Sequence, residues 1–284
     1  MPDQSLTTLL LPVALGVIML GLGLGLSLDD FKRVLRFPRA VAIALFCQMV
    51  LLPLVCFALT LAFALPPVFA VGLMLLAASP GGATANLFSH LAKGDVALNI
   101  TLTAVNSVLS VATLPLIVNL AMSYFMGESK AIPLQFGKTI QVFAIVLVPV
   151  ALGMAIRARR PELATRFTRP VKILSIVFLV LIVAAALVKE WDVLTAHAGQ
   201  IGLAALAFNL LSLGLGYLLP ILARLGKRQA IAIGMEIGIH NGTLAIAIAM
   251  SPTLLANTTM AVPAAVYSII MFFTAAAFGY LVNR

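Results

Sequence analysis

Charged side chains are scarce in this sequence. Only 10% of the 284 residues are Asp, Glu, Lys or Arg, whereas 62% are hydrophobic, and the mean hydropathy is +1.15. A soluble domain of this length needs far more polar surface, so the composition excludes one. Several apolar runs extend over about 18 residues or more, enough for a helix to cross a bilayer core of roughly 30 Å. The sequence therefore predicts an all-α polytopic membrane protein.

Cysteines are few as well, and no basic segment stands at the N-terminus. Cys47 and Cys56 are the only cysteines, and they share one apolar run. Their spacing suits neither a metal site nor a disulfide, so we expect both to pack in the interior. No basic segment precedes the first apolar run, which argues against a cleavable signal peptide. The chain also shows no catalytic arrangement, so we predict that it is not an enzyme and uses no cofactor.

Nine membrane spans are predicted, with boundaries uncertain by about three residues. They are 6–28, 40–64, 68–92, 96–124, 138–157, 171–189, 200–223, 229–250 and 258–282. The short connections include DDFKRVLRFPR (29–39), KGD (93–95), RARRPELATRFTRP (157–170) and RLGKR (224–228). In the first span, the glycines of GLGLGLSL (21–28) are predicted to allow close helix packing.

The basic residues predict the orientation of the chain. If the N-terminus lies outside, 15 of the 18 lysines and arginines fall on the inside, as the positive-inside rule requires. We therefore expect the C-terminus in the cytoplasm and, from the short loops, a bacterial inner membrane. The net charge of +9 then requires no nucleic-acid partner. The bilayer is the predicted environment, and the sequence gives no oligomeric state.

Two spans differ from the rest because small residues and a proline interrupt them. Pro80, Gly81 and Gly82 fall in the third span, and Gly238 and Gly242 fall in the eighth. Helix breaks at membrane depth persist only where protein or water satisfies the freed backbone groups. In the predicted topology the two spans run in opposite directions, which is typical of inverted-repeat transporters with a site at the midplane. We expect one transporter domain over 1–284, with a first repeat of about 6–124 and a second of about 138–282.

Glu236 is the one acidic residue well inside a predicted span. The other eight, near termini, loops or span ends, are Asp3, Asp29, Asp30, Asp95, Glu128, Glu162, Glu190 and Asp192. A carboxylate at membrane depth must be neutralised by a proton, a cation or a basic partner. No Lys or Arg lies at a comparable depth, so a proton or a metal cation remains. His240, four residues later, is a candidate partner. The alternative is a structural role, with a protonated Glu236 bonded between helices.

Oxygen donors cluster around these two breaks. They are Gln48, Thr84, Asn86, Asn99, Thr103, Asn106, Asn241 and Thr243. Amide and hydroxyl oxygens suit a hard cation such as sodium. Asn99 and Thr103 are four residues apart and share one helical face. Taken singly, a buried Asn or Thr is more often an interhelical hydrogen bond, but the coincidence with broken helices and a buried acid favours an ion site. Helix N-termini at the breaks favour an anionic substrate.

The first hypothesis is a secondary transporter of an organic anion that works by alternating access. An ion channel is less favoured, because a pore needs a sustained polar lining and the polarity here is confined to one cluster. A membrane enzyme would need a nucleophile or metal constellation, which the sequence does not show. Saturable, gradient-driven uptake would distinguish a carrier from a channel, and product formation would distinguish it from an enzyme.

Four stretches resemble the bile acid:sodium symporter family. They are FCQMVLLP (46–53), SPGGATANLFSHLAKGDVALNITLT (79–103), EIGIHNGTLAIAIA (236–249) and AVPAAVYSI (261–269). The resemblance extends over essentially the whole chain. It implies a panel domain, a core domain with two crossing discontinuous helices, and sodium-coupled uptake of an organic anion. Arsenite carriers of related architecture use a cysteine in the first broken helix, which is absent here.

The resemblance also implies site residues. The first sodium site would consist of Asn86, Asn99, Thr103 and Glu236. The second would consist of Gln48, Glu236, His240 and the backbone carbonyls of Ile237 and Ile239. The substrate, a bile acid or a smaller carboxylate, would lie near Ala83, Thr84, Asn86 and Asn241.

Two departures from the family pattern affect these sites. Ala85 stands where the family has a serine hydroxyl, although the Asn99 amide, at a position where serine is common, offers partial compensation. His240 stands where the family usually has glutamine, and a neutral imidazole is a poor sodium ligand. We predict that the second sodium site is weakened or lost. Sodium is the expected coupling ion, and the alternative is a proton-coupled or uncoupled carrier that uses Glu236 and His240.

Overall fold

The computed structural model describes residues 13, 16–127, 136–252 and 254–284. Helices account for nearly all of this part of the chain, and it contains no strand, only one isolated bridge between Gly81 and His240. The all-α prediction is therefore confirmed for these residues. The physical reason is that a helix satisfies its backbone groups within one segment, which lipid requires.

Four helices in the described part are long and apolar enough to cross a membrane. They are Pro38–Ala62, Val96–Met126, Thr195–Leu222 and Thr259–Val282. These agree with the predicted spans 40–64, 96–124, 200–223 and 258–282. Within the first of them, α3 (Pro38–Phe46) and α4 (Leu52–Ala62) are joined by a π-helical turn, Cys47–Leu51. Cys47 and Cys56 are free and buried there, as expected.

Most of the other helices also fall near the predicted spans, and α2 (Leu28–Lys32) is the exception. The shorter helix Gly16–Gly25 lies in the first predicted span, whose beginning is outside the described residues. The remaining bounds are α2 (Leu28–Lys32), α5 (Pro67–Ala78), α6 (Ala83–Leu91), α7 (Val96–Met126), α8 (Phe136–Arg159), α9 (Pro161–Lys189), α10 (Trp191–Leu222), α11 (Lys227–Gly238), α12 (Gly242–Met250) and α13 (Val262–Val282).

Two predicted connections are helical instead. The segment 157–170 was expected to be a loop, yet α8 continues to Arg159 and α9 begins at Pro161. Proline is well suited to the first position of a helix, because its missing N–H has no intrahelical partner there. The segment 29–39 contains α2 and a 3₁₀ turn, Arg33–Arg36, and α2 begins with a capping box between Ser27 and Asp30.

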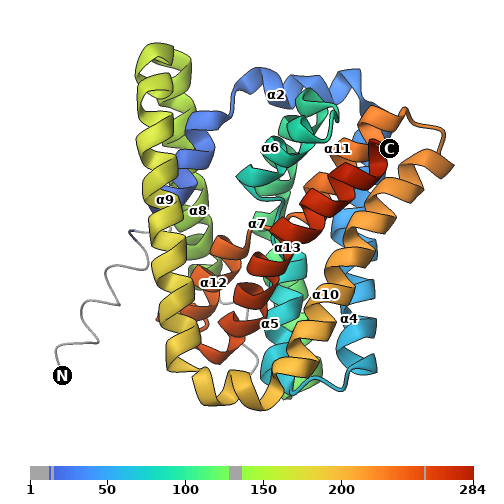
Figure 1. The fold of residues 1–284 in the computed structure, drawn as a ribbon. Helices are drawn as coiled ribbons and strands as arrows, with labels where there is room; N and C mark the ends of the chain where they lie inside the picture. Colours follow the sequence, from blue (N-terminus) through green and yellow to red (C-terminus); the bar gives the residue numbers. More distant parts are fainter. Residues whose placement is uncertain (1–12, 14–15, 128–135, 253) are drawn as a thin grey trace.

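The helices form two groups (Figure 1). Helix Gly16–Gly25, α8 and α9 stand together at the left, and we call them the side group; the remaining helices form the main group. Gly23 and Gly153 allow the first helix and α8 to approach closely, because a Cβ at Gly23 would overlap the backbone of Val150 and one at Gly153 the backbone of Leu20. The predicted packing role of the glycines in 21–28 is thus confirmed at Gly23.

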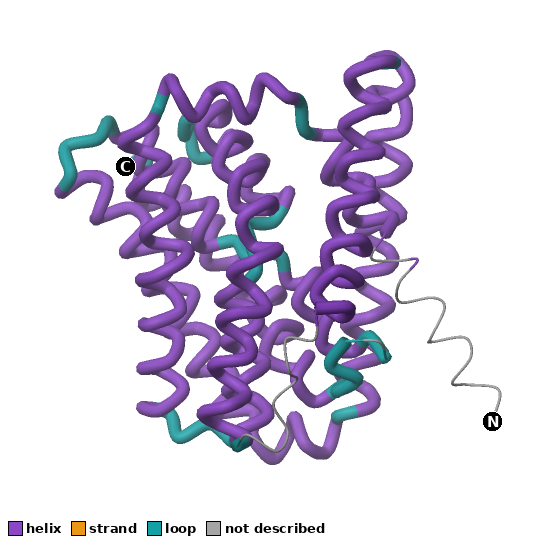
Figure 2. Tube along the Cα trace, turned by 180° about the vertical axis from the view of Figure 1, so that it is seen from behind, coloured by secondary structure: helices purple, strands orange, loops and turns teal. Residues whose placement is uncertain are grey.

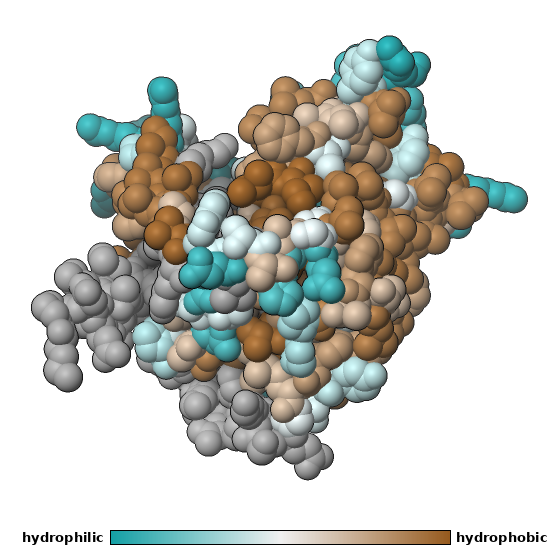
Figure 3. All heavy atoms as spheres, turned by 60° about the horizontal axis from the view of Figure 1, so that its bottom comes forward, coloured by the Kyte–Doolittle hydropathy of each residue, from teal (hydrophilic) through white to brown (hydrophobic). Residues whose placement is uncertain are grey.

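The segments rich in basic residues meet at one end of the molecule. Helix α2, the connection from α8 to α9, the connection from α10 to α11 and the end of α13 all lie at the top of Figure 1. Figure 3, in which the opposite end comes forward, shows hydrophilic side chains in the middle and hydrophobic ones above and to the right of them. Large apolar side chains are exposed along the helices, for example Phe273 at 74% and Leu120 at 63%. Such extensive apolar exposure is typical of a surface that faces lipid.

Two helices are interrupted near the middle of the main group. The first is broken between α5 and α6, over residues 79–82, and the second between α11 and α12, over residues 239–241. Figure 2 shows loop segments at mid-height between helical ones. The two interruptions lie against each other, so this crossing positions the candidate site.

Candidate cation and substrate site

The two interruptions satisfy each other's backbone groups. The amide of Gly82 donates to the Ile239 carbonyl at 2.7 Å, and the amide of Asn241 donates to the Pro80 carbonyl at 2.8 Å. This pair of bonds is antiparallel, like a minimal piece of sheet. Unpaired backbone groups at membrane depth cost several kcal/mol each, of order 2–7 kcal/mol. The crossing therefore provides the partners that each broken helix lacks.

Glu236 lies directly against this crossing. Its side chain is fully buried, with 0% exposure. Thr103 donates to Oε2 at 2.6 Å, and Asn106 donates to Oε1 at 3.3 Å. A Cβ on Gly81 would overlap the carboxylate, so a larger residue at that position of the crossing would displace the acid. The glycine of the first break thus makes room for the acid of the second.

No basic side chain neutralises Glu236 in the described part of the chain. The two ion pairs found there, Lys32–Asp29 and Arg33–Asp30, belong to α2 and the turn that follows it. A buried carboxylate without a basic partner requires a proton or a bound cation. The surroundings of Glu236 thus have the polarity expected of a cation or proton site.

Among the residues expected for a first cation site, Thr103 contacts Glu236, whereas Asn86 and Asn99 contribute buried amide groups. Asn99 donates from Nδ2 to the Ala232 carbonyl at 2.7 Å. The Oδ1 atoms of Asn86, Asn99 and Asn106 are buried without a hydrogen-bond partner. Such orphaned buried acceptors are rare and require a physical explanation. Amide oxygens of this kind are suitable ligands for a hard cation.

The π-helical turn Cys47–Leu51 positions Gln48. Pro53 follows closely and cannot donate a backbone hydrogen bond, which favours a local departure from α-helical geometry. Gln48 donates from Nε2 to the carbonyls of Ala77 and Ser79 at 3.2 and 3.0 Å. Its Oε1 is buried without a partner. Gln48 therefore binds the end of α5 and leaves one oxygen available.

His240 does not pair with Glu236, contrary to one interpretation of the sequence. Its Nδ1 lies 3.2 Å from the Ser79 carbonyl, and its Nε2 has no hydrogen-bond partner. The ring stacks on Phe208, with centroids 5.4 Å apart, and meets Tyr267 edge to face at 5.5 Å. Helix α11 ends at Gly238, so a spacing of four residues no longer places His240 one helical turn above Glu236.

The backbone carbonyls expected at a second cation site have different surroundings. Ile239 accepts the hydrogen bond from Gly82 described above, whereas Ile237 is fully buried at the end of α11. Between them, the Gly238 carbonyl accepts a hydrogen bond from the Tyr267 hydroxyl at 2.8 Å. The Ile239 carbonyl is thus engaged in the crossing itself.

A cavity of about 290 Å³ opens beside the crossing, and we call it the central cavity. Its polar lining includes Thr84, Asn86 and Asn241 from the main group and Thr168 from the side group. Ala83, also expected near substrate, is the first residue of α6. The cavity is bounded by both helix groups, because residues 18–26 form another part of its wall.

Two helix N-termini meet at this cavity. Helix α6 begins at Ala83 and α12 at Gly242. Asn241 caps α12 by accepting a hydrogen bond from the Leu244 amide at 3.0 Å. Free N–H groups at such termini carry partial positive charge and favour anions. The cavity can therefore stabilise negative charge although none of its described lining residues is Asp, Glu, Lys or Arg.

Several residues of the site were not assigned to either predicted cation site, although Asn106 was among the expected oxygen donors. Asn106 and Ser79 contact Glu236 and His240, and Asn209 donates to the Gly238 carbonyl at 2.9 Å. A signal for Asn106 existed, because it lies three residues after Thr103 on the same helical face. No local pattern indicates Ser79 as a backbone acceptor or Thr168 as a cavity residue.

An all-α membrane protein with two broken helices crossing at a buried acid belongs to the class of membrane transporters. Sequence comparison supports this class. The profile of the sodium bile acid symporter family matches residues 12–197. The chain therefore belongs to this family, which consists of transporters rather than enzymes, and it is an integral membrane protein.

Individual relatives are similar over most of this chain. An uncharacterized sodium-dependent transporter of Bacillus subtilis is 31% identical over 261 residues, which cover 90% of this chain and 78% of that protein. A probable chloroplastic sodium/metabolite cotransporter of rice is 27% identical over 266 residues, which cover 94% of this chain and 62% of the rice protein. A rat sodium-dependent organic anion transporter is 27% identical over 246 residues, with 84% and 64% covered. The chain thus spans less than two thirds of the length of the rice and rat proteins.

Proposed function

We propose that this protein is a secondary active transporter that couples the movement of an organic anion to sodium. One observation carries the proposal: Glu236 is fully buried at the helix crossing with no basic partner among the described residues, and nearby buried amide oxygens lack hydrogen bonds. The names of the Bacillus, rice and rat relatives, which refer to sodium dependence, a metabolite and an organic anion, support the same function.

In this proposal the first sodium ion binds between α6, α7 and α11. The carboxylate of Glu236, the hydroxyl of Thr103 and the amide oxygens of Asn86 and Asn99 are its ligands. The ion replaces the hydrogen bond from Thr103 to Glu236, which occupies the same position in the structure. Neutralising the carboxylate lowers the cost of moving it through the membrane interior.

The anion, a bile acid or a smaller carboxylate, binds in the cavity beside the crossing. The N-termini of α6 and α12 supply positive potential, and Asn241 and Thr84 supply polar contacts. The side group would act as the panel and the main group as the core, which rock against each other in alternating access. The two sequence repeats, nine spans, an outside N-terminus and a bacterial inner membrane remain part of this proposal.

The second sodium site is weakened or lost in the proposed mechanism. His240 places an imidazole where the site would need an oxygen, and the Ile239 carbonyl is bonded to Gly82. Gln48 Oε1 is free to bind an ion, but His240 does not supply the second side-chain oxygen that the site would need. We therefore propose one coupled sodium ion for each transport cycle.

Proton coupling is the second candidate. The hydrogen bonds from Thr103 and Asn106 hold the Glu236 carboxyl in place without an ion, an arrangement that also suits a protonated acid. In that mechanism Glu236 alone exchanges the proton, because His240 makes no hydrogen bond to it.

Thermal stability in detergent distinguishes the two candidates. The purified chain and Glu236→Gln are titrated with sodium or potassium at several pH values. A ligand that binds only the folded state raises stability by RT ln(1 + [L]/Kd). Stabilisation by sodium but not potassium, lost in Glu236→Gln, is the expected result. Stability that follows pH through Glu236 without a sodium effect would favour the proton instead.

Uptake into proteoliposomes with an imposed sodium gradient then tests transport itself.

A further inference from the structure

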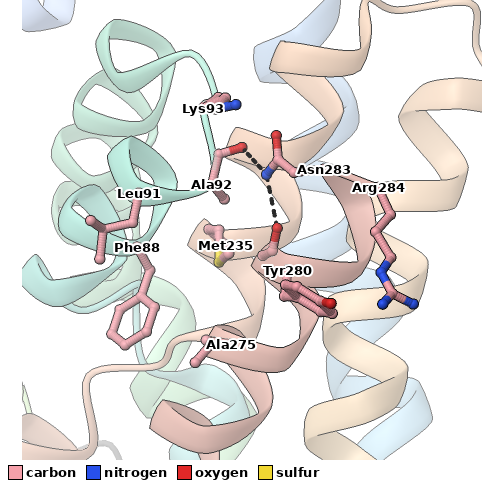
Figure 4. Close-up of a pocket in the computed structure, with 11 residues that line it drawn as sticks. Phe88, Leu91, Ala92, Lys93, Met235, Ala275, Tyr280, Asn283 and Arg284 are labelled. Carbon is pink, nitrogen blue, oxygen red and sulfur yellow. Dashed lines mark hydrogen bonds between the residues drawn. The ribbon is translucent and has the colours of Figure 1, made fainter.

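A second pocket lies at the end of the molecule where α6 and α13 terminate (Figure 4). Its volume is about 380 Å³. Phe88, Leu91 and Ala276 contribute to its apolar wall, and Lys93 and Arg284 stand at its edge. We call this pocket the terminal groove. It combines an apolar wall with two cations, and the cation and substrate sites proposed above do not use it.

The edge of the terminal groove is held in place by backbone contacts. Asn283 donates from Nδ2 to the carbonyls of Ala92 and Gly279, both at 2.8 Å, and thereby ties the end of α13 to the end of α6. Lys93 has a left-handed backbone conformation, with φ of 59°, and its amide donates to His90 at 3.0 Å. The Lys93 backbone is thus fixed relative to the end of α13.

The charges at the groove lack acidic partners in the described part of the chain. Both ion pairs found there lie in the segment 29–33. The Arg284 guanidinium lies 4.8 Å above the ring of Tyr280, a cation–π contact that leaves its N–H groups available. Lys93 is exposed as well. Two cations at the edge of one groove attract a negatively charged group.

The position of the groove along α13 indicates what surrounds it. Thr259–Val282 is long and apolar enough to cross the membrane, so Arg284 lies just beyond its end, at the level of the lipid headgroups. Leu91 is 66% exposed and Tyr280 is 61% exposed. An exposed leucine and tyrosine at this depth face acyl chains and the interface, as expected for a membrane helix.

We propose that the terminal groove binds an anionic phospholipid. Its phosphate lies at the edge of the groove, which Lys93 and Arg284 flank from different sides, and an acyl chain packs along Phe88, Leu91 and Ala276. Basic pockets between membrane helices bind anionic headgroups in this way. Phe88 also stacks on Phe272, which lines the central cavity, with centroids 6.0 Å apart. A bound lipid therefore packs against Phe88, whose ring touches a residue that lines the central cavity.

Lipid titration of the delipidated full-length chain in detergent tests this proposal. Phosphatidylglycerol and phosphatidylcholine with the same acyl chains are added, and binding is followed by thermal stability and native mass spectrometry. Phosphatidylglycerol is expected to bind more tightly. Each removed cation should weaken its binding by about fivefold, so Lys93→Gln with Arg284→Gln should weaken it by about 25-fold. Phosphatidylcholine binding should be unchanged.

Matched variants separate this site from general surface charge. Lys227→Gln with Arg228→Gln removes two charges from the same end of the molecule but outside the groove, and it should retain the preference for phosphatidylglycerol. Ala276→Trp, on an exposed position of the apolar wall, should reduce binding of the lipid without changing the charge.

Three results would overturn the proposal. The first is equal binding of the two lipids by the parent chain. The second is that the control variant, Lys227→Gln with Arg228→Gln, loses as much phosphatidylglycerol binding as the variant with both groove cations removed. The third is that glycerol 3-phosphate alone stabilises the chain as much as phosphatidylglycerol does, which would indicate a site for free anions. None of these readouts depends on transport, so the lipid site and the proposed transport function are tested independently.

Discussion

The hydroxyl of Thr103 lies 2.6 Å from Oε2 of Glu236, although 133 positions separate the two residues in sequence. The same offset occurs one helical turn earlier, where Asn99 donates to the Ala232 carbonyl at 2.7 Å. Two equal offsets, one turn apart, mean that α7 and α11 run side by side in the same direction. This parallel contact brings the hydroxyl and amides of α7 to the buried acid of α11.

Removing the Thr103 hydroxyl should weaken sodium binding. Thr103→Val keeps the shape of the side chain but deletes an oxygen beside the carboxylate, and an interaction with a charged group contributes about 1.5–3 kcal/mol. We expect the sodium concentration for half-maximal thermal stabilisation to rise by about tenfold or more. Thr103→Ser, which retains the hydroxyl, serves as the control. Equal sodium responses of the Val and Ser variants would contradict the assigned role.

Gly81→Ala should disrupt the crossing. The added Cβ overlaps the Glu236 carboxylate, so the acid or the first break must shift. We expect the free energy of unfolding to fall by about 1–3 kcal/mol and the sodium response to be lost. At Gly199, a Cβ meets no atom within 4 Å, so Gly199→Ala is a control expected to be nearly neutral. An unchanged sodium response in Gly81→Ala would show that the fit between Gly81 and Glu236 is unimportant.

His240→Gln should restore a second sodium site. The substitution introduces an amide oxygen next to Gln48, whose own Oε1 has no partner. Equilibrium binding of radiolabelled sodium should give one ion for each parent chain and two for the variant. His90→Gln, at an exposed position, controls for loss of a histidine. Two ions bound by the parent chain would refute the proposed stoichiometry.

Thr168→Phe should block substrate binding while sparing the cation site. Thr168 lines the central cavity from the side group, so a large ring there fills space that an anion needs. Saturable anion uptake should be lost, whereas sodium should still stabilise the variant. Thr165→Phe places the same ring on an exposed position three residues earlier, outside the cavity. Retained uptake in Thr168→Phe would place the substrate elsewhere.

Local sequence patterns predicted the helices better than their ends. Spans such as 96–124 and 258–282 were predictable because long apolar runs have few alternatives in lipid. The segment 157–170 was mistaken for a loop because its charge suggested a solvated connection. Its helix formers and the N-terminal Pro161 determine the local structure instead. The charge of a segment thus predicts its surroundings better than it predicts its backbone conformation.

For the candidate site, residue types were predictable but contacts were not. Glu236 and the glycines of the first break were evident from the sequence, because an acid and a Pro-Gly-Gly run are unusual in apolar spans. The candidate partnership of Glu236 and His240 is not formed, because α11 ends at Gly238 and the two side chains no longer share a helical face. The backbone bends away there, and His240 contacts Ser79 and Phe208 instead.

The sequence by itself determined that this chain resides in a membrane, that two of its helices are broken, and that one of the breaks includes an acid. These properties follow from composition and local propensity, which are readable position by position. Only the tertiary structure decided that Gly81 lies against Glu236 and that Thr103 donates to it. Such contacts depend on the rotation and displacement of whole helices, which the packing of all their neighbours fixes together.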